Sequence, residues 1–468
     1  PDGGYGWFVV LGCFIMHVIM GGLDRSEGVF FLLLQDTFSH SAQLTAWPGA
    51  IVCTLQLLLG PLANALCSKY SVRTVVIVGG LLMSSGLILN CSATSLYFLI
   101  FSHAIVGGVG RGLVYAPALI IVGMYFDRRV GLAAGLGTSG VGIGTFVIVP
   151  LAQYLSEHHG FIVTYLIMGG LSLNMLVAGM LFRPLSMHYK ITRSRRYQTK
   201  SGQASEEAAT LHPYKPKLNN VRKHNGHYDN QPNCSAEQEG VVSGATSLPV
   251  EVVMGKQKQR RDVKMRSDKK CPARLHAWIT KLFHFYLLKE PPFLMFCVSI
   301  WLFAMAFRAA FTFMPALVKS RGIPESEAAM ALSTAGAVDT IGRIVAGLLL
   351  DTSLLRPHRL VLYNVVVFCV AGVAFILPSL TTIASFCVFC GLYGLFTGAF
   401  ISQKSVVLVD LLGQEHMASS FGLLIGFQGV GSLLGPPLAG TLKDRFGSYD
   451  EAFYLGGGLL LVSGLLMV

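Results

Sequence analysis

Twelve apolar stretches, each about as long as a membrane-spanning helix, constrain this chain more than any other feature of its sequence. A helix needs roughly 20 apolar residues to cross about 30 Å of hydrocarbon. Stretches of that length lie near residues 7–34, 45–67, 74–92, 96–124, 131–156, 161–182, 293–318, 327–350, 359–379, 383–409, 418–442 and 450–468. Because backbone polar groups must be satisfied inside lipid, the sequence predicts an all-α integral membrane protein with twelve transmembrane helices.

Charged residues are scarce and unevenly distributed along the chain. They make up 13% of the sequence, against about 25% in typical soluble proteins. Residues 185–290 alone hold 20 of the 36 Lys and Arg residues but only 9 of the 24 Asp and Glu residues. We therefore predict a six-helix bundle over 1–184, a basic and largely disordered linker over 185–290, and a second six-helix bundle over 291–468.

The positions of Lys and Arg predict the orientation of the chain in the membrane. Positively charged loops stay on the cytoplasmic side, and the basic linker follows an even number of spans. We therefore expect a multi-pass protein with both termini in the cytoplasm. As a separate expectation, we place it in the plasma membrane. Lys69 and Arg73 agree with this orientation, whereas Lys443 and Arg445 fall on the predicted outer side.

Several other classes of function lack support in the sequence. The net charge of +12 comes from the linker, so it does not indicate nucleic-acid binding. A glycine-rich string over 137–144 lies inside an apolar run with no preceding strand, which favours helix packing over a nucleotide loop. Cys387 and Cys390 have no second Cys or His pair to complete a zinc site. No catalytic triad is present, and we expect neither metal, cofactor nor enzyme activity.

The two halves of the chain repeat each other in the same direction. At an offset of 287 residues, residues 135–170 match residues 422–457 at ordered positions that include Pro150, Leu151 and Ala152 against Pro437, Leu438 and Ala439. The matched segments are the fifth and sixth spans of each half. Two parallel six-helix repeats resemble the plan of the major facilitator superfamily.

Local signatures narrow that resemblance to one family within the superfamily. The chain opens with Asp2, Gly3, Gly4, Tyr5, Gly6 and Trp7, and the fourth span is followed by Tyr125, Phe126, Arg128, Arg129, Leu132, Ala133 and Gly135. Arg183 and Pro184 close span six, and Gly435, Pro436 and Pro437 mark span eleven. Together these residues resemble the monocarboxylate transporters, although Tyr5 stands where that family normally has Trp or Phe.

The resemblance implies transport but leaves the solute open. Members of the family carry small monocarboxylates, often with a proton, while some branches carry aromatic amino acids, iodinated thyronines, creatine or carnitine. Some members also travel to the plasma membrane with a single-pass immunoglobulin-type glycoprotein. The expected partners are therefore a small organic anion, a proton, the lipid bilayer and such an ancillary protein, with no nucleic acid.

Ionisable residues inside the predicted spans identify the candidate site. Each one costs about 2.5–3.5 kcal/mol on insertion scales, so each suggests a function. Five are basic and three acidic, an excess that suits an anion. They are Asp24, Arg25, Glu27, Arg111, Arg308, Asp339, Arg343 and Lys404.

Asp339 and Arg343 form the most informative pair. Four residues apart on a helix, they share a face. Protonation of Asp339 would release the planar guanidinium of Arg343 to bind a substrate carboxylate at two points. The family resemblance gives the same pair the proton-coupling and substrate-binding roles, and a permanent structural ion pair is the alternative.

The remaining charges receive more general roles. Arg25 aligns with a lysine of the proton-coupled members, and because arginine keeps its charge it can attract an anion but cannot relay a proton. We assign Arg308 and Lys404 to substrate binding together with Arg25, and Asp410 is the expected partner of Lys404.

A second group of charged residues receives secondary or gating roles. These residues are Asp24, Glu27, Arg111, Arg128 and Arg129. Here Asp24 and Glu27 partly neutralise Arg25, and Arg111 pairs across the two halves. His17 and His103 are interpreted as hydrogen-bonded packing residues.

Three functions remain open from the sequence. The leading hypothesis is a proton-linked carrier of a small monocarboxylate that works by alternating access. An uncoupled facilitator of a larger or zwitterionic solute is the second, because Thr397 occupies a position where small-acid carriers have an aromatic residue. A non-transporting scaffold or sensor is the third, although a scaffold gains nothing from the costly charges of Asp339 and Arg343.

Overall fold

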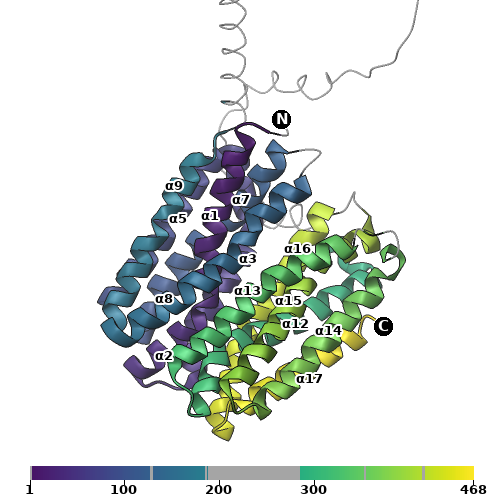
Figure 1. Cartoon of the computed structure of the whole chain (residues 1–468). Coiled ribbons are helices and arrows are strands. Elements are labelled where there is room, and N and C mark those ends of the chain that lie inside the picture. Colours follow the sequence, from purple (N-terminus) through teal and green to yellow (C-terminus); the bar gives the residue numbers. More distant parts are fainter. Residues whose placement is uncertain are drawn as a thin grey trace, which may run out of the picture. The chain divides into compact units, whose positions relative to one another are not determined.

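A computed structural model of the chain describes residues 3–126, 130–184, 187, 285–350, 352, 355–413 and 417–468. Over these residues the chain is helical and contains no strand. Most of the predicted linker lies outside the described residues, as do Arg128 and Arg129. Figure 1 shows the helices running in long, roughly antiparallel passes.

The N-terminal half makes six passes, several of them interrupted. The first consists of α1 and α2, which meet at Ser26, and the second of α3 and α4, which are bent by 44°. The fourth contains a π-helix, η2, between α6 and α7. In chain order the elements are α1 (Gly6–Arg25), α2 (Glu27–Phe38), α3 (Ala42–Leu58), α4 (Gly60–Lys69), α5 (Val72–Leu89), η1 (Asn90–Ser92), α6 (Leu96–Leu99), η2 (Ile100–Gly107), α7 (Gly108–Tyr125), α8 (Val130–Ser172) and α9 (Asn174–Leu181).

Helix α8 supplies both the fifth and the sixth pass. Gly160 interrupts it with φ 71° and ψ −171°, a conformation open to glycine and strained for other residues. The chain reverses there, and α9 completes the sixth pass. The N-terminus and the end of α9 consequently lie at the same end of the bundle (Figure 1).

The C-terminal half also makes six passes, with short 3₁₀ turns between some of them. Helices α12 and α16 contain prolines, Pro315 in one and Pro436 and Pro437 in the other. In chain order the elements are η3 (Phe285–Lys289), α12 (Pro291–Ser320), α13 (Glu325–Leu350), η4 (Arg356–His358), α14 (Arg359–Ile376), η5 (Leu377–Ser379), α15 (Ile383–Leu412), α16 (Met417–Phe446) and α17 (Asp450–Leu465).

The length and hydropathy of these helices support the predicted membrane spans. In the described part of the chain, nine helices are long and apolar enough to cross a membrane, or ten if the bent pair α3 and α4 counts as one span. The stretch Leu132–Leu181, with 50 residues, holds two passes, and α17 forms the last pass with 16 residues. The prediction of twelve helices in two sets of six is confirmed.

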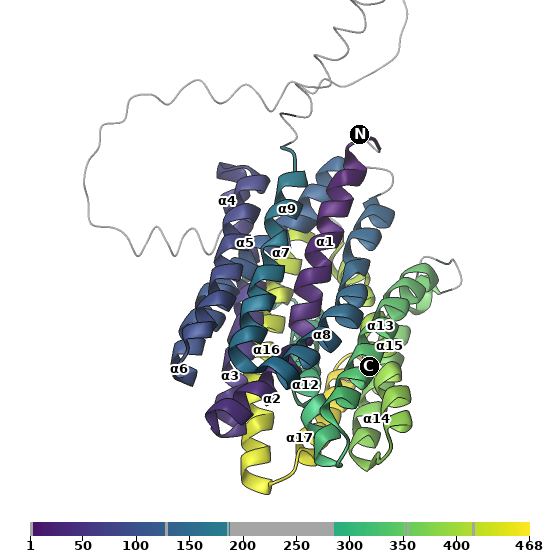
Figure 2. The same cartoon turned by 60° about the vertical axis from the view of Figure 1, so that its left-hand side comes forward.

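The two halves contact each other in a symmetric pattern. Helix α3, in the second pass of the first half, packs along α16, the fifth pass of the second half. Conversely, α13, the second pass of the second half, packs along α8, which carries the fifth pass of the first half. Figure 2 shows α16 beside α3 on one side of the bundle. This exchange of equivalent helices is what two parallel repeats require.

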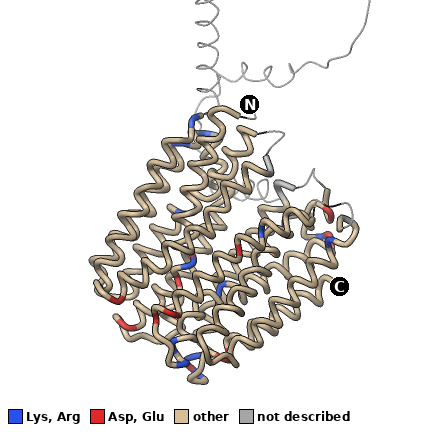
Figure 3. Tube along the Cα trace, viewed as in Figure 1, with Lys and Arg blue, Asp and Glu red and all other residues tan. Residues whose placement is uncertain are grey.

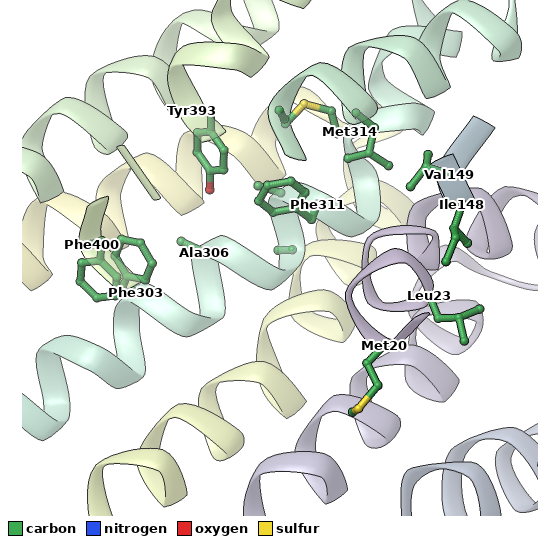
Figure 4. Close-up of a cluster of buried hydrophobic side chains, with 14 of the residues drawn as sticks. Met20, Leu23, Ile148, Val149, Phe303, Ala306, Phe311, Met314, Tyr393 and Phe400 are labelled. Carbon is green, nitrogen blue, oxygen red and sulfur yellow. The ribbon is translucent and has the colours of Figure 1, made fainter. Parts of the chain in front are cut away.

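Buried side chains fill the interior while large apolar side chains also cover the outside. Figure 4 shows part of the interior, where the rings of Phe303 on α12 and Phe400 on α15 stack with centroids 3.4 Å apart. On the outer surface, Phe146 and Leu348 are 62% and 70% exposed. Apolar residues on that surface suit contact with lipid chains.

Candidate functional site

Charged residues gather at the ends of the helices, and a small group lies inside the bundle (Figure 3). The first pass contributes Asp24, Arg25 and Glu27 on either side of the break at Ser26. Asp24 and Glu27 are three residues apart and share a face, whereas Arg25 points about 100° away. The same short segment therefore presents acidic groups to one neighbour and a basic group to another.

Asp339 on α13 lies at the centre of the site and is fully buried. Its Oδ2 accepts a hydrogen bond from Nε of Arg343 at 2.8 Å, as the spacing of four residues predicted. Its Oδ1 accepts one from Nη2 of Arg25 at 3.3 Å. We call Arg25, Asp339 and Arg343 the central triad. Because Arg25 belongs to the N-terminal half, this triad joins the two halves of the chain.

Aromatic rings of α12 hold the guanidinium of Arg25 in place. The guanidinium carbon lies 3.7 Å from the ring centroid of Phe311 and 5.0 Å from that of Phe307. Both distances are within the range of a cation–π interaction, which is strengthened where water is excluded. Arg25 is 5% exposed, so its charge is stabilised by one carboxylate and two ring faces.

Arg111 on α7 forms a second ionic group, which lies within the N-terminal half. Its Nη1 contacts Asp24 Oδ1 at 2.5 Å and Glu27 Oε1 at 3.7 Å. Gln56 on α3 also donates to Asp24 at 3.3 Å. The expectation that Arg111 pairs across the halves is therefore wrong. Asp24 and Glu27 contact Arg111 rather than Arg25, because the turn of the helix points them to a different side.

Arg308 and Lys404 supply the other two cations of the site. Arg308 on α12 is 7% exposed, and within the described residues neither a hydrogen bond nor an ion pair engages its guanidinium. Lys404 on α15 donates to Oε1 of Gln428 at 2.9 Å. The expected partner of Lys404, Asp410, instead accepts from Arg359 at 3.0 Å. That pairing corrects the prediction.

Sequence comparison assigns the chain to a family. Residues 13–394 match the Major Facilitator Superfamily. Over the whole chain, identity is 31% with monocarboxylate transporter 12-B of Danio rerio, of which 87% is covered, and 31% with monocarboxylate transporter 12 of Homo sapiens, of which 80% is covered. The chain belongs to the monocarboxylate transporter family. It is accordingly a multi-pass membrane transporter rather than an enzyme.

The fold has a counterpart among solved structures. A bacterial homologue of the human lysosomal transporter Spinster, in an inward-facing and unoccupied conformation, superimposes with a TM-score of 0.60 at 14% identity. The match covers 100% of this chain and 95% of the other. At this identity the likeness extends to the major facilitator fold alone.

Three further residues can be compared with what the sequence predicted, two of them histidines expected to be hydrogen-bonded packing residues. Nδ1 of His17 lies 2.8 Å from the carbonyl oxygen of Cys13, as expected of a packing residue. His103 differs, because neither ring nitrogen has a hydrogen-bond partner in the described structure. Thr397 is fully buried with its hydroxyl donating to the carbonyl of Gly394 at 3.1 Å. The nearby aromatic residues of α15 that contact α12 are Tyr393 and Phe400.

Proposed function

We propose that this transporter carries a small monocarboxylate together with a proton, and that the central triad performs both tasks. The observation that supports this proposal is the sharing of the Asp339 carboxylate between two arginines from different halves. Two guanidinium groups facing one carboxylate leave an excess positive charge in a buried place. A carboxylate from the substrate is the anion that would compensate it.

The coupled proton would bind to Asp339 and so change the net charge of the same site. Protonation removes the negative charge that holds Arg25 and Arg343, so both guanidinium groups become available to the substrate. A guanidinium offers two parallel N–H donors that match the two oxygens of a carboxylate. Proton and substrate therefore favour each other at this site, which is the requirement for symport.

The location of the triad relates binding to the movement of the two halves. Arg25 lies on α1, and Asp339 lies on α13, so their ion pair ties one half to the other. Protonation of Asp339 and binding of substrate would weaken this ion pair. The two halves must move relative to each other during alternating access, and the ion pair lies between them. Arg308, buried without an ion pair in the described structure, is a further cation for the anionic solute. We include the plasma membrane and cytoplasmic termini in this proposal.

A facilitator of a larger or zwitterionic solute is the second candidate. Thr397 supports it because this position lacks the aromatic side chain that narrows the site in small-acid carriers. The two candidates differ in whether transport responds to a proton gradient.

The substitution Asp339→Asn tests the proposal because it mimics the protonated carboxyl permanently. We expect net proton-driven uptake to fail, whereas exchange of labelled for unlabelled substrate survives better. Exchange never requires the empty carrier to return after releasing its proton. Radiolabelled lactate, pyruvate, creatine and aromatic amino acids are screened in proteoliposomes with and without an inward proton gradient, and surface expression is measured in cells.

Two outcomes would contradict the proton-coupling role. Removing one partner of a buried pair costs about 3–5 kcal/mol if the pair is purely structural, so expression and exchange would then fail together. Full uptake that ignores pH in both the parent and the Asn variant would favour the facilitator. Asp410→Asn is the matched control, because Asp410 is an exposed partner of Arg359 and lies away from the triad.

A further inference from the structure

A small, partly open cavity lies where the N-terminal half meets α12 of the C-terminal half. Its volume is about 10 Å³, and polar residues from several helices line it. This is about the space that one water molecule needs. The lining includes Glu27 on α2, Thr45 and Gly49 on α3, His103 on η2, Tyr165 on α8 and Thr312 on α12.

Several polar atoms around this cavity have no hydrogen-bond partner in the described structure. They are Oε1 of Glu27, both ring nitrogens of His103 and the hydroxyl of Tyr165. Glu27 and His103 are 7% and 2% exposed, and Tyr165 is fully buried. Buried polar groups in folded proteins nearly always have a hydrogen-bond partner, so three such groups around one cavity indicate that it is occupied by something polar.

The separation of Glu27 and His103 suits a bridging water. Nε2 of His103 lies 3.6 Å from Oε1 of Glu27, which is too long for a direct hydrogen bond. A water in the cavity beside the two groups, about 2.8 Å from each atom, would satisfy both of them. Gly49 contributes the remaining space, because a side chain there would occupy the place of the Glu27 carboxylate.

The backbone around His103 is also unusual. His103 lies in the middle of the π-helix Ile100–Gly107, which interrupts the fourth pass between α6 and α7. π-Helical turns are rare and occur frequently at functional sites, where the wider turn redirects a side chain. Here the redirected side chain is an imidazole beside a buried carboxylate.

Two arginines contribute the positive charge that faces Glu27. Arg111 on α7 contacts both Asp24 and Glu27, so one cation serves two carboxylates. Arg308 on α12 also faces both carboxylates, although it makes no ion pair with either among the described residues. Two cations therefore face two carboxylates, and a proton taken up by Glu27 or His103 adds one positive charge to this buried group.

We propose that Glu27 and His103, bridged by a water molecule, form a second proton-binding site in the N-terminal half. Glu27 and Arg25 lie two residues apart on different sides of the first pass and contact different partners. The site does not depend on the proton-coupling role of Asp339. Both groups are polar enough to exchange a proton through the water, and Tyr165 is placed to orient that water.

Infrared titration of the reconstituted full-length protein tests this site. The carbonyl stretch of protonated carboxyl groups is followed against pH in the parent, in Glu27→Gln and in His103→Gln. We expect Glu27→Gln to remove one titrating component that Asp339→Asn leaves in place, and His103→Gln to shift the pH at which that component appears. His17→Gln is the matched control, because His17 is a buried histidine bonded to its own helix.

A second measurement keeps the test independent of how well the Glu27 variant folds. The ring ¹⁵N signals of His103 are followed with pH in the parent protein, and loss of the signal in His103→Gln assigns it. A pH-dependent signal at either Glu27 or His103 supports the site. Signals that do not change with pH at both groups overturn it, whatever the result for Asp339 and for transport.

Discussion

Asp339 divides its two carboxylate oxygens between arginines that come from different halves of the chain. Oδ2 binds Arg343 on the same helix, and Oδ1 binds Arg25 on α1. Each arginine thereby retains donors that the carboxylate does not use. These donors explain why the type of cation, and not its charge alone, matters at this site.

Replacement of Arg343 by Lys should impair transport strongly although the charge is kept. A compact ammonium group cannot bind Asp339 and a substrate carboxylate with two parallel bonds. Loss of one charge-assisted hydrogen bond is worth about 1.5–3 kcal/mol, which corresponds to roughly a ten- to hundredfold fall in uptake. Initial rates of uptake, normalised to surface expression, measure the effect.

Arg359→Lys is the control for this substitution, since Arg359 pairs with the exposed Asp410 at the end of the bundle. We expect it to transport as the parent does. Near-normal uptake by Arg343→Lys at normal surface expression would contradict the role in carboxylate binding and return Arg343 to a structural ion pair.

At the scale of elements, the close approach of α13 and α15 fixes the position of Asp339. Gly398 on α15 lies directly against the backbone carbonyl of Asp339, and Gly394 lies against that of Ala335 one turn earlier. In return, Gly342 on α13 lies against the carbonyl of Leu395. Small residues at such crossings let helices in membranes pack backbone to backbone.

The substitution Gly398→Ala should therefore disturb the central triad without changing any charge. A methyl group at this position would overlap the carbonyl oxygen of Asp339, so α15 must move away. Overpacking of this kind costs about 1–3 kcal/mol and displaces the backbone. We expect a marked fall in uptake and a lower thermal midpoint of the detergent-solubilised protein.

Gly391→Ala provides the comparison on the same helix, because the nearest atom to a side chain there would be 3.6 Å away, an ordinary contact distance. This substitution should leave both the uptake and the thermal midpoint close to those of the parent. Equal effects of the two substitutions would show that helix propensity, rather than the contact with Asp339, determines the outcome.

At the scale of the whole molecule, the two halves also contact each other at the end of the bundle opposite the N-terminus. Oδ1 of Asp444 accepts from the backbone N–H of Ala42, and Oδ2 accepts from that of Gln43, both at 2.9 Å. A carboxylate of α16 thus caps the first turn of α3, where N–H groups lack partners within the helix. Lys319 adds an ion pair with Asp36 at 3.3 Å.

The substitution Asp444→Ala should make the two halves separate more often at the end of the bundle opposite the N-terminus. A cap contributes about 0.5–2 kcal/mol, so the open population should rise by roughly two- to thirtyfold. Labelling of a cysteine placed at Thr45, which is 2% exposed, by a membrane-impermeant maleimide measures the opening. The rate in the Asp444 variant is compared with that of the same protein with Asp444 intact.

The control for this experiment is Asp450→Ala, which removes an ion pair with Arg321 inside the C-terminal half. It should leave labelling of the Thr45 cysteine unchanged. Unchanged labelling in Asp444→Ala as well would show that the cap does not hold the halves together.

Much of the fold followed from local properties of the sequence, while much of the candidate site did not. Hydropathy located the passes, and the spacing of Asp339 and Arg343 predicted their contact because four residues make about one helical turn. By contrast, the contact of Arg25 with Asp339 joins residues 314 positions apart. The sequence also predicted a partner of Arg111 in the other half and a hydrogen bond for His103, and the described structure has neither.

By itself, the sequence determined that the chain is a membrane protein with two parallel six-helix halves and buried charges in known spans. Only the tertiary structure decided which charge meets which. The difference has a physical cause: partition into lipid and helix periodicity act along the chain over one span. The rotation and offset of one helix against another depend instead on packing between distant segments, such as the backbone contact of α13 with α15, and these set the partners of Arg25, Arg111 and Glu27.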